Sequence, residues 1–386
     1  MIIEIIFWTL FFLITYSYIG YAVILLIILA LKHKERRVFV QEFPPITLLI
    51  AAFNEKDILE AKLLNTAVLD YPKEKITQLW ITDGSTDGSE LILKQRSDIQ
   101  VLHHEERNGK IGAINRAMPY VKTPIVVFSD ANTILEPQAI KEIIGYFSDP
   151  NTGCVAGEKC ILKQLSDSAV SNGEGLYWKY ESFIKKLESC VNSTIGAAGE
   201  LYAIRTELFT AAEPDTILDD FVISMRIAQK GYAIKYASKA IASERASISI
   251  PEELKRKVRI GAGSMQTLIR MTSLLNIFKY KMLSYQYWSH KVIRWTVVPF
   301  ATVLVLITNI YLVVYTKSTV YQIFILIQSI FYLLALNGWV FRNSKTRLRI
   351  IFAPYYMITM NYAIVAGIIR YIKGFQSVNW EKAKRL

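Results

Sequence analysis

The sequence predicts an α/β protein in which a doubly wound, mostly parallel sheet is joined to α-helical transmembrane segments. Between residues 46 and 130, short apolar runs typical of buried strands alternate with helical stretches, which is the pattern of a parallel sheet covered by helices. Apolar segments long enough to cross a membrane precede and follow this region. Together these observations place a globular domain between membrane segments.

The composition favours a membrane surface over nucleic acid as the partner of this basic chain. The 386 residues are 52% hydrophobic and carry a formal net charge of +12. Such a charge suits either nucleic acid or an anionic membrane, and the flanking apolar segments favour the membrane. The cysteines, Cys154, Cys160 and Cys190, form no Cys-x-x-Cys, which argues against a disulfide framework and against a zinc site.

The first apolar segment, Ile5–Leu31, contains no charged residue. As a helix it would extend about 40 Å, more than the ~30 Å of a hydrocarbon core. A cleaved signal peptide is the alternative, but no basic residue precedes the segment and the apolar run is too long. Basic residues follow at once, so the positive-inside rule places this end in the cytoplasm and the N-terminus outside. They are Lys32, Lys34, Arg36 and Arg37.

Polar residues directly follow three of the predicted strands. The strands are expected at Ile46–Ala52, Gln78–Thr82, Ile99–His103 and Ile125–Phe128. The polar residues are Asn54 with Glu55, Asp83, and Asp130. Because ligands bind outside the carboxyl ends of strands in an open α/β sheet, we expect these side chains to converge on one edge.

Asp130 and Asn132 lie two residues apart at the end of the fourth strand, so their side chains are expected to point the same way. A carboxylate and an amide oxygen suit a hard divalent cation that leaves other positions for water and substrate phosphates. The alternative is that Asp130 only caps the next helix.

The second half of the domain is less regular. A helix is expected over Gly173–Cys190, and a turn of small residues precedes a short strand that ends at Arg205. Asp219 and Asp220 open a helix that Gly231 terminates. Carboxylates at a helix N-terminus are favoured by the helix dipole, but capping explains only one of the two.

Residues 251–294 have the composition of amphipathic helices that lie in a headgroup layer. From Leu254 to Arg294 there are nine Lys and Arg residues and no Asp or Glu, with apolar and aromatic residues between them. Three further spanning or re-entrant helices are expected within residues 295–369, and a basic tail over residues 370–386. The spans are Val297–Tyr315, Val320–Val340 and Ile350–Ile369.

The charges near the last span conflict with a full crossing. With Lys32 inside, a fourth crossing would place the basic tail outside, against the positive-inside rule. Pro354 and Asn361 lie within the last span, so a broken or re-entrant course is the alternative.

Six short motifs follow one another in a specific order. They are Ala51-Ala52-Phe53-Asn54-Glu55, Asp83-Gly84-Ser85-Thr86-Asp87, Asn108-Gly109-Lys110, Asp130-Ala131-Asn132, Ala198-Gly199-Glu200 and Asp219-Asp220. By these motifs, residues 46–246 resemble the processive-type family 2 glycosyltransferases, the membrane-anchored group of cellulose, chitin, hyaluronan and poly-N-acetylglucosamine synthases. The resemblance implies a GT-A-like catalytic domain over residues 38–250, with a transmembrane helix and basic flank over residues 1–37.

The resemblance also implies roles for individual residues. Asp220 would be the general base with Asp219 beside it, and Gly199 and Glu200 would bind the acceptor. Asp130 and Asn132 would hold Mg²⁺ or Mn²⁺. The nucleotide-sugar donor would contact Ala52, Asn54, Glu55, Asp83, Lys110, Asp130 and Arg259.

Two departures from the family pattern bear on the reaction. Asn132 stands where the family's metal motif has a second carboxylate, so a metal would be held more weakly. The family's Gln-x-x-Arg-Trp motif is replaced by Arg256-Lys257-Val258-Arg259-Ile260, which keeps only the arginine. The tryptophan of that motif normally stacks on the acceptor sugar, and its loss favours a single addition or short chains.

The implied function is an inverting, metal-dependent sugar transfer from a nucleotide sugar, most simply a UDP-sugar. The acceptor would be either a growing polysaccharide or a membrane lipid. The protein would be integral to the plasma membrane, with its catalytic domain in the cytoplasm. A transporter is the competing class, but it predicts charged residues within the spans, which contain none. A nucleotide-sugar sensor without activity would form no product.

Overall fold

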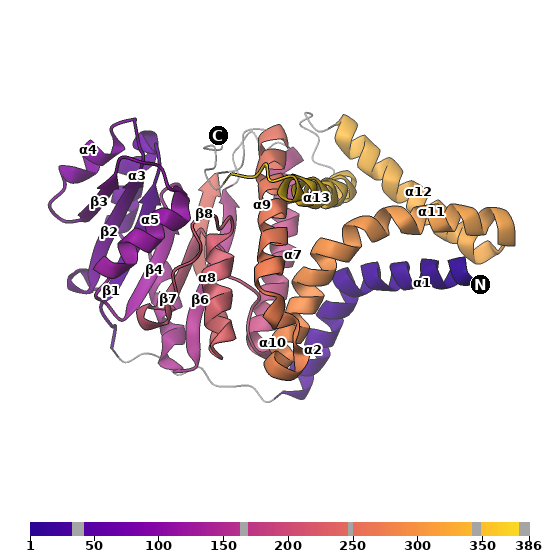
Figure 1. Cartoon of the computed structure of the whole chain (residues 1–386), viewed down its shortest axis with the longest axis horizontal. Helices are drawn as coiled ribbons and strands as arrows, with labels where there is room; N and C mark the ends of the chain where they lie inside the picture. Colours follow the sequence, from indigo (N-terminus) through magenta and orange to yellow (C-terminus); the bar gives the residue numbers. More distant parts are fainter. Residues whose placement is uncertain (33–41, 163–168, 246–249, 342–348, 378–386) are drawn as a thin grey trace. The chain divides into compact units, whose positions relative to one another are not determined.

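The computed structural model describes residues 1–32, 42–162, 169–245, 250–341 and 349–377 (Figure 1). It forms two compact units. The sheet unit comprises Lys32–Leu162, Glu181–Arg245 and Gln376–Leu386, and the helical unit comprises Met1–Leu31, Lys163–Tyr180 and Ala246–Phe375. The predicted basic flank at Lys34, Arg36 and Arg37 and the tail residues 378–386 lie outside the described residues.

The sheet unit is built on eight described strands in the order β3-β2-β1-β4-β7-β6-β8-β5. The strands are β1 (Ile46–Ala52), β2 (Ile76–Asp83), β3 (Gln100–His104), β4 (Ile125–Asp130), β5 (Ile134–Leu135), β6 (Thr152–Leu162), β7 (Leu201–Arg205) and β8 (Ala233–Arg245). β1 to β4 pair in parallel, as do β6 and β8, whereas β7 is antiparallel to β4 and β6 and β5 is antiparallel to β8. The predicted mostly parallel sheet is therefore confirmed.

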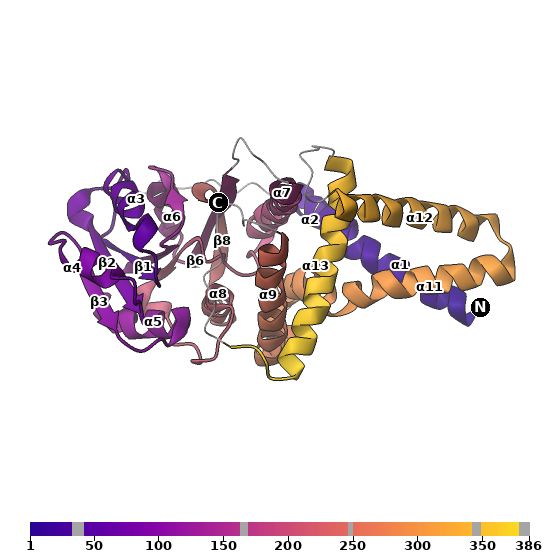
Figure 2. The same cartoon turned by 90° about the horizontal axis from the view of Figure 1, so that it is seen from above.

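Helices cover both faces of this sheet. They are α3 (Lys56–Ala67), α4 (Ser89–Lys94), α5 (Gly109–Ala117), α6 (Ala139–Ile144) and α8 (Asp219–Gln229), with 3₁₀ turns at Lys73–Lys75, Met118–Tyr120, Gly145–Ser148 and Thr206–Leu208. Figure 2 shows α3 and α6 on one face and α5 and α8 on the other. This arrangement is the predicted doubly wound one, and it leaves the strand ends open to ligands.

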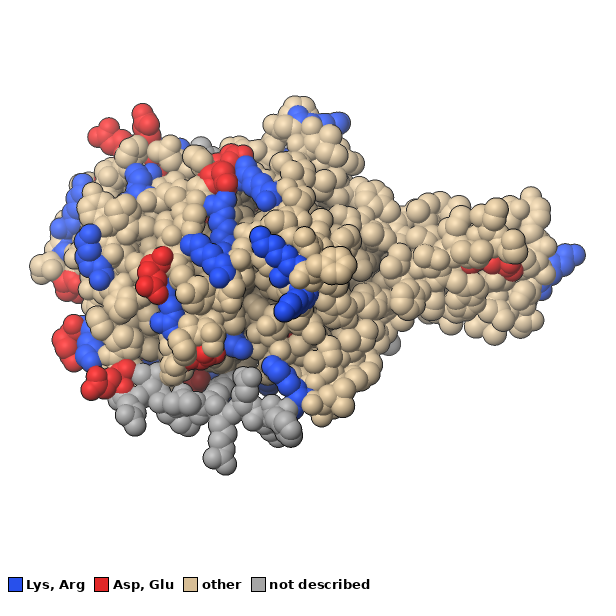
Figure 3. Space-filling model, turned by 60° about the horizontal axis from the view of Figure 1, so that its bottom comes forward, with Lys and Arg blue, Asp and Glu red and all other residues tan. Residues whose placement is uncertain are grey.

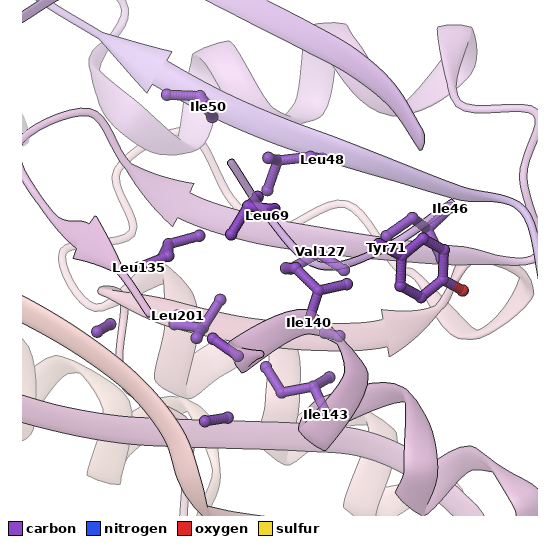
Figure 4. Packing of buried hydrophobic residues seen from close by; sticks show 14 of the residues in the cluster. Ile46, Leu48, Ile50, Leu69, Tyr71, Val127, Leu135, Ile140, Ile143 and Leu201 are labelled. Atoms are coloured by element: carbon purple, nitrogen blue, oxygen red, sulfur yellow. The ribbon is translucent and has the colours of Figure 1, made fainter. Parts of the chain in front are cut away.

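The core beneath α3 and α6 fixes the register of the central strands. Ile46, Leu48 and Ile50 alternate along β1 with no exposed surface, and they pack with Val127 of β4 and Ile140 of α6 (Figure 4). Alternate residues of a strand point to the same face, so a one-residue slip would expose this whole set. The packing therefore holds the ends of β1 and β4 at one level.

The second half of the domain contains two long strands, β6 and β8, that the sequence did not predict. β6 and β8 pair over most of their lengths, with register shifts between Thr152 and Cys154 and between Gly157 and Glu158. β6 contains two glycines and β8 is rich in alanine, lysine and serine, so neither strand has the β-branched composition of β1 or β4. Their pairing is stabilised by burial within the sheet instead.

The helical unit contains four described helices that are long and apolar enough to cross a membrane: Ile2–Leu31, Ile277–Thr316, Thr319–Val340 and Phe352–Ile372. Its elements are α1 (Ile2–Thr15), a π-helix (Tyr16–Gly20), α2 (Tyr21–Leu31), α9 (Ile250–Arg270), a 3₁₀ turn (Thr272–Leu275), α10 (Ile277–Tyr287), a π-helix (Trp288–Val297), α11 (Val298–Thr316), α12 (Thr319–Val340) and α13 (Arg349–Ile372). Helix α7 (Ala169–Val191) runs through both units. Figure 3 shows few charged side chains over α1, α11 and α12 in its view.

The boundaries of two predicted segments differ in the structure. The helical stretch Ile277–Thr316 runs through the predicted border at residue 294, with a kink at Lys281, whose φ is 48°. α13 is one continuous helix through Pro354 and Asn361, so the broken course is not observed. Its side chains are described from Phe352 onward.

Candidate active site

Three strand ends meet at one edge of the sheet, as predicted. Ala51 of β1 lies opposite Asp130 of β4, and Ala52 lies opposite Thr82 of β2. Ala52 and Glu55 are both buried, at 3% and 4% exposure. The loops that follow β1, β2 and β4 therefore start from neighbouring positions.

Hydrogen bonds join the loops after β1 and β2. The backbone N–H of Thr86 donates to Oδ1 of Asn54 at 2.7 Å, and the backbone N–H of Lys56 donates to Asp87 at 2.9 Å. Asn54 has φ 52°, a left-handed conformation that asparagine tolerates better than most residues. The predicted nucleotide contact Asn54 thus also holds its loop in place.

Asp83 connects β2 to the loop that precedes α5. Its Oδ1 accepts from the guanidinium of Arg116 at 2.8 Å, and its Oδ2 accepts from the backbone N–H of Asn108 at 2.9 Å. The Arg107 guanidinium lies 3.6 Å from the centre of the Phe53 ring, which adds a cation–π contact between the first and third loops.

Lys110 brings β4 and α8 together. Its Nζ donates to Oδ1 of Asp130 at 2.6 Å and lies 3.6 Å from Oδ2 of Asp219. Burial disfavours the charge of Lys110, but Asp130, Asp219 and Asp220 outweigh it, so the pKa of Lys110 is raised. Burial raises the pKa of Asp130, and the nearby ammonium opposes that shift.

Asp220 lies at the start of α8 beside this ion pair. A Cβ placed on Gly199 would come 3.0 Å from Nζ of Lys110 and 3.4 Å from Oδ2 of Asp220, so a larger residue at this position would crowd both groups. Burial and the negative charge of Asp219 raise the pKa of Asp220 to about 7, against the opposing effect of Lys110. A carboxylate with this pKa can gain and lose a proton near neutral pH.

Glu200 is held by a buried ion-pair network that we did not predict. Its carboxylate pairs with the ammonium of Lys159 on β6, which also pairs with Glu244 on β8. Burial alone would raise the pKa of Glu200, but Lys159 reverses the effect and the pKa is lowered. Glu200 is therefore ionised, and its charge contributes to raising the pKa of Asp130 and Asp220.

A second unpredicted lysine supports the turn that carries Asp130 and Asn132. Lys62 of α3 has no exposed surface, and its Nζ donates to Oγ of Ser129 at 2.9 Å and to the carbonyl of Thr133 at 2.7 Å. Lys62 thus binds the residues on both sides of the predicted metal ligands. Burial lowers its pKa to about 7, against the opposing charge of Asp130.

The sequence contains a weak signal that Lys62 is buried, and no such signal for Lys159 or Glu244. Lys62 follows Leu59 by three residues and precedes Thr66 by four, so it lies on the inward face of its helix. Lys159 and Glu244 lie on β6 and β8, the strands that the sequence did not predict.

The predicted site residues divide into three groups. Asp130, Asp219, Asp220, Gly199 and Lys110 form the cluster just described. Glu200 adjoins it, whereas Asn54 lies in the loop after β1 and Asp83 is the last residue of β2. Arg259 lies on α9 in the helical unit. Its contact with a donor stays a prediction.

The protein's oxygen ligands at this site are too few to hold a hard cation alone, but they fit one when a substrate supplies further ligands. Among the described residues, no three acidic, histidine or cysteine side chains converge on a metal position. Asp130 and Asn132 offer oxygen atoms, and carboxylates exceed ammonium groups in the surrounding cluster. Mg²⁺ commonly binds through one or two carboxylates plus substrate phosphates, and this arrangement suits that mode.

Comparisons with known proteins agree with this geometry. Residues 44–263 match the model of the family described as glycosyltransferase like family 2. The poly-β-1,6-N-acetyl-D-glucosamine synthase of Staphylococcus aureus is 29% identical over 253 residues, covering 62% of this chain and 59% of the relative. The same-named enzyme of Staphylococcus epidermidis is 26% identical over 245 residues, covering 60% and 57%. The chain thus spans about three fifths of the length of these curated relatives.

The fold of the whole chain is also that of a solved protein. A mannosyltransferase from Pyrobaculum calidifontis, solved in complex with GDP-Man and Mn²⁺, superposes with a TM-score of 0.70. The match covers 97% of this chain and 100% of that chain, at 18% sequence identity. The family match extends over more than half of the chain and includes every motif of the cluster around Lys110. This chain is therefore a membrane-associated glycosyltransferase of family 2 with a GT-A fold.

Proposed function

We propose that this protein is an inverting, metal-dependent glycosyltransferase that moves a sugar from a nucleotide sugar, most simply a UDP-sugar, to a growing polysaccharide. The observation that carries the proposal is the cluster of Lys110, Asp130, Asp219 and Asp220 at the open edge of the sheet. The relatives named as poly-β-1,6-N-acetyl-D-glucosamine synthases make N-acetylglucosamine the first sugar to test.

Asp220 is the proposed general base. Its carboxylate takes the proton of the acceptor hydroxyl, whose oxygen then bonds to the anomeric carbon of the donor sugar. The bond from that carbon to the diphosphate oxygen breaks, and the nucleoside diphosphate leaves. A single displacement of this kind inverts the anomeric configuration. The pKa of about 7 suits Asp220 to the proton transfer.

The ligands proposed for Mg²⁺ or Mn²⁺ are Asp130 and Asn132, with the donor diphosphate completing the shell. A bound cation would neutralise the charge that develops on the leaving diphosphate. Lys110 is placed to add a positive charge on the same side, and Arg259 of α9 is a further proposed donor contact. Ala52, Asn54, Glu55 and Asp83 would bind the nucleoside.

The acceptor has two candidate classes. The curated relatives support a polysaccharide, made by repeated addition and possibly linked to secretion through the membrane helices. The sequence Arg256-Lys257-Val258-Arg259-Ile260 supports a single addition to a membrane lipid, because it lacks the tryptophan that stacks on the acceptor in processive enzymes. Gly199 and Glu200 would contact the acceptor in either case.

The catalytic domain, residues 38–250, is proposed to lie on the cytoplasmic side of the plasma membrane, because basic residues follow the first span. Nucleotide sugars are then supplied directly from the cytoplasm. The amphipathic segment over residues 251–294 would lie at the membrane surface between this domain and the later spans.

The test is product formation by the full chain in membranes. Labelled UDP-N-acetylglucosamine, UDP-glucose and GDP-mannose are supplied separately with Mg²⁺ or Mn²⁺, and the products are separated by size and by extraction into organic solvent. A long water-soluble product supports the synthase, and a single labelled sugar on a lipid supports the alternative. The Asp220→Asn variant is the matched control. Label incorporation that is equal in this variant would overturn the proposed mechanism.

A further inference from the structure

The last candidate span, α13, differs from the other three in composition and surroundings. Its most apolar window has a mean hydropathy of 1.3, against 2.3, 2.4 and 1.9 for the others. Arg370 lies in its last turn and Lys373 directly follows it, and the charges of the tail sequence conflict with a full crossing. By length and composition alone it could still span a bilayer.

The second half of α13 is packed directly on α9. A Cβ added to Gly367 would lie 2.5 Å from the carbonyl oxygen of Val258 and from the backbone nitrogen of Ala262. A Cβ added to Gly261 would lie 2.8 Å from the carbonyl oxygen of Ala363. Backbone meets backbone here, and only glycine allows this approach. The depth of α13 in the membrane is therefore tied to the depth of α9.

Helix α9 cannot lie within hydrocarbon. The two turns before its contact with α13 carry Lys255, Arg256, Lys257 and Arg259, and Glu252 and Glu253 precede them. Arg256 pairs with Glu253 at 2.9 Å, but the paired groups remain charged and need water or headgroups. If α13 crossed the membrane, Ala363 near its midpoint would hold Gly261 close to the bilayer centre, and Arg259, two residues away on α9, would lie within the hydrocarbon.

The arrangement of the helices within the unit points to the same conclusion. α11 and α12 form a hairpin of 19 and 22 residues, or about 28 and 33 Å, which matches a hydrocarbon core of ~30 Å. In Figures 1 and 2, α13 runs across this hairpin instead of along it, and so does α9. A bilayer spanned by the hairpin therefore has α9 and α13 lying in its plane.

We propose that α13 does not cross the membrane but lies with α9 in the headgroup layer on the face where α2 ends. Chain order supports this, because α9 precedes the outward helix α11 and α13 follows the returning helix α12. The chain then crosses three times, through α1–α2, α11 and α12. Arg370 and Lys373 then lie on the inner face beside anionic headgroups, in agreement with the positive-inside rule.

The lipid bilayer is the proposed occupant of the outer side of α13. Tyr362, Ile369 and Ile372 are 60%, 48% and 72% exposed, and the cationic ends of the helix suit anionic headgroups. The proposed position of α13 does not depend on the donor, the metal or the acceptor, so it can be tested independently of the proposed function.

Cysteine labelling tests the number of crossings. Cys154 and Cys190 are replaced by alanine, and the exposed native Cys160 is kept as a marker of the side on which the sheet unit lies. Ser318→Cys and Phe375→Cys are then added separately, in the α11–α12 turn and after α13. A membrane-impermeant maleimide is applied to right-side-out and inside-out vesicles. We expect position 375 to label from the same side as Cys160 and position 318 from the opposite side. Labelling of 375 from the side of 318 would overturn the proposal.

Spin-label depth provides the second measurement. Labels at Phe375→Cys, Ile369→Cys and Tyr362→Cys in lipid vesicles are compared by their accessibility to oxygen and to a water-soluble nickel complex. A helix in the headgroup layer gives similar shallow depths at all three positions. A depth maximum at 362 would show that α13 enters the hydrocarbon, and it would overturn the proposal even if position 375 labels from the inner side.

Discussion

The ammonium of Lys110 lies 2.6 Å from Oδ1 of Asp130, where the proposed cation would bind. A divalent cation bound there would therefore compete with Lys110 for one carboxylate. A donor diphosphate would relieve the competition by offering Lys110 another partner, so metal and nucleotide should bind more tightly together than separately.

The first prediction concerns this competition. In Lys110→Met, we expect Mn²⁺ alone to bind about tenfold more tightly and UDP to bind about tenfold more weakly, each equal to about 1.4 kcal/mol. Titration of Mn²⁺ followed by electron paramagnetic resonance measures the first effect, and calorimetry measures the second. The exposed Lys94 on α4 provides the matched control, Lys94→Met. If metal affinity without nucleotide does not change, Lys110 does not compete.

The second prediction concerns the metal ligands. Asp130→Ala should abolish the effect of Mn²⁺ on UDP affinity, because Asn132 alone offers only a neutral oxygen. Asn132→Asp should tighten Mn²⁺ binding, because a carboxylate replaces the amide. Both variants are compared by UDP titrations with and without Mn²⁺. Equal UDP affinity in Asp130→Ala and the unmodified protein under both conditions would exclude a metal at this position.

The third prediction concerns the general base. Asp220→Asn should reduce the transfer rate by roughly 10²–10⁴-fold, because the amide cannot accept the hydroxyl proton. Donor affinity should remain nearly unchanged, and calorimetry with UDP provides that control. If Asp220→Asn keeps more than roughly a tenth of the rate while Asp219→Asn does not, then Asp219 is the base.

The fourth prediction concerns pH. As the proposed general base, Asp220 would have to be deprotonated, so with its pKa raised to about 7 we expect kcat/KM to rise with pH until about 7 and then level off. Asp219→Asn removes a negative charge that raises this pKa, so the pKa of Asp220 should fall and the acidic limb should move to lower pH. A pH–rate profile of both proteins measures the shift. If the acidic limb of the profile does not move in Asp219→Asn, the limb reports the ionisation of a group other than Asp220.

The fifth prediction concerns Lys62. Lys62→Met removes the donor that joins Ser129 to Thr133, so the turn with Asp130 and Asn132 should loosen. We expect the affinity for UDP with Mn²⁺ to fall about tenfold, equal to about 1.4 kcal/mol. Thr133→Val should lower it by a similar factor, and the double variant should show less than the sum, because both act through one network. Additive losses, or a loss explained by a lower thermal midpoint alone, would contradict this role.

The sequence predicted the parallel half of the sheet and the residues at its open edge. The apolar runs of β1 and β4 contain successive buried residues, Leu48 with Leu49 and Val126 with Val127, so both faces of these strands are covered and composition alone identifies them. Strand direction then places Asp83 and Asp130 at the same edge. The motifs predicted that Lys110, Asp130 and Asp219 lie near one another. They did not predict which of their atoms are in contact.

The residues around the site that were not predicted are buried by contacts between segments distant in sequence. Lys159 and Glu244 become buried partners only when β6 pairs with β8. A lysine in a strand that lacks β-branched residues gives no sign of burial, since lysine is almost always exposed. The same applies to Lys62, whose partners Ser129 and Thr133 are more than sixty residues away.

The hydrogen bonds that join the loops after β1, β2 and β3 have a consequence for the thermodynamics of donor binding. Asn54, Asp83 and Asp87 already hold Thr86, Asn108 and Lys56 in the free protein. Ordering a side chain on binding costs about 0.5–1.5 kcal/mol. Side chains that these hydrogen bonds already order in the folded protein do not add this cost when the donor binds. Nucleotide association should therefore lose little conformational entropy in these loops, and their backbone amides should show similar hydrogen-exchange rates with and without UDP.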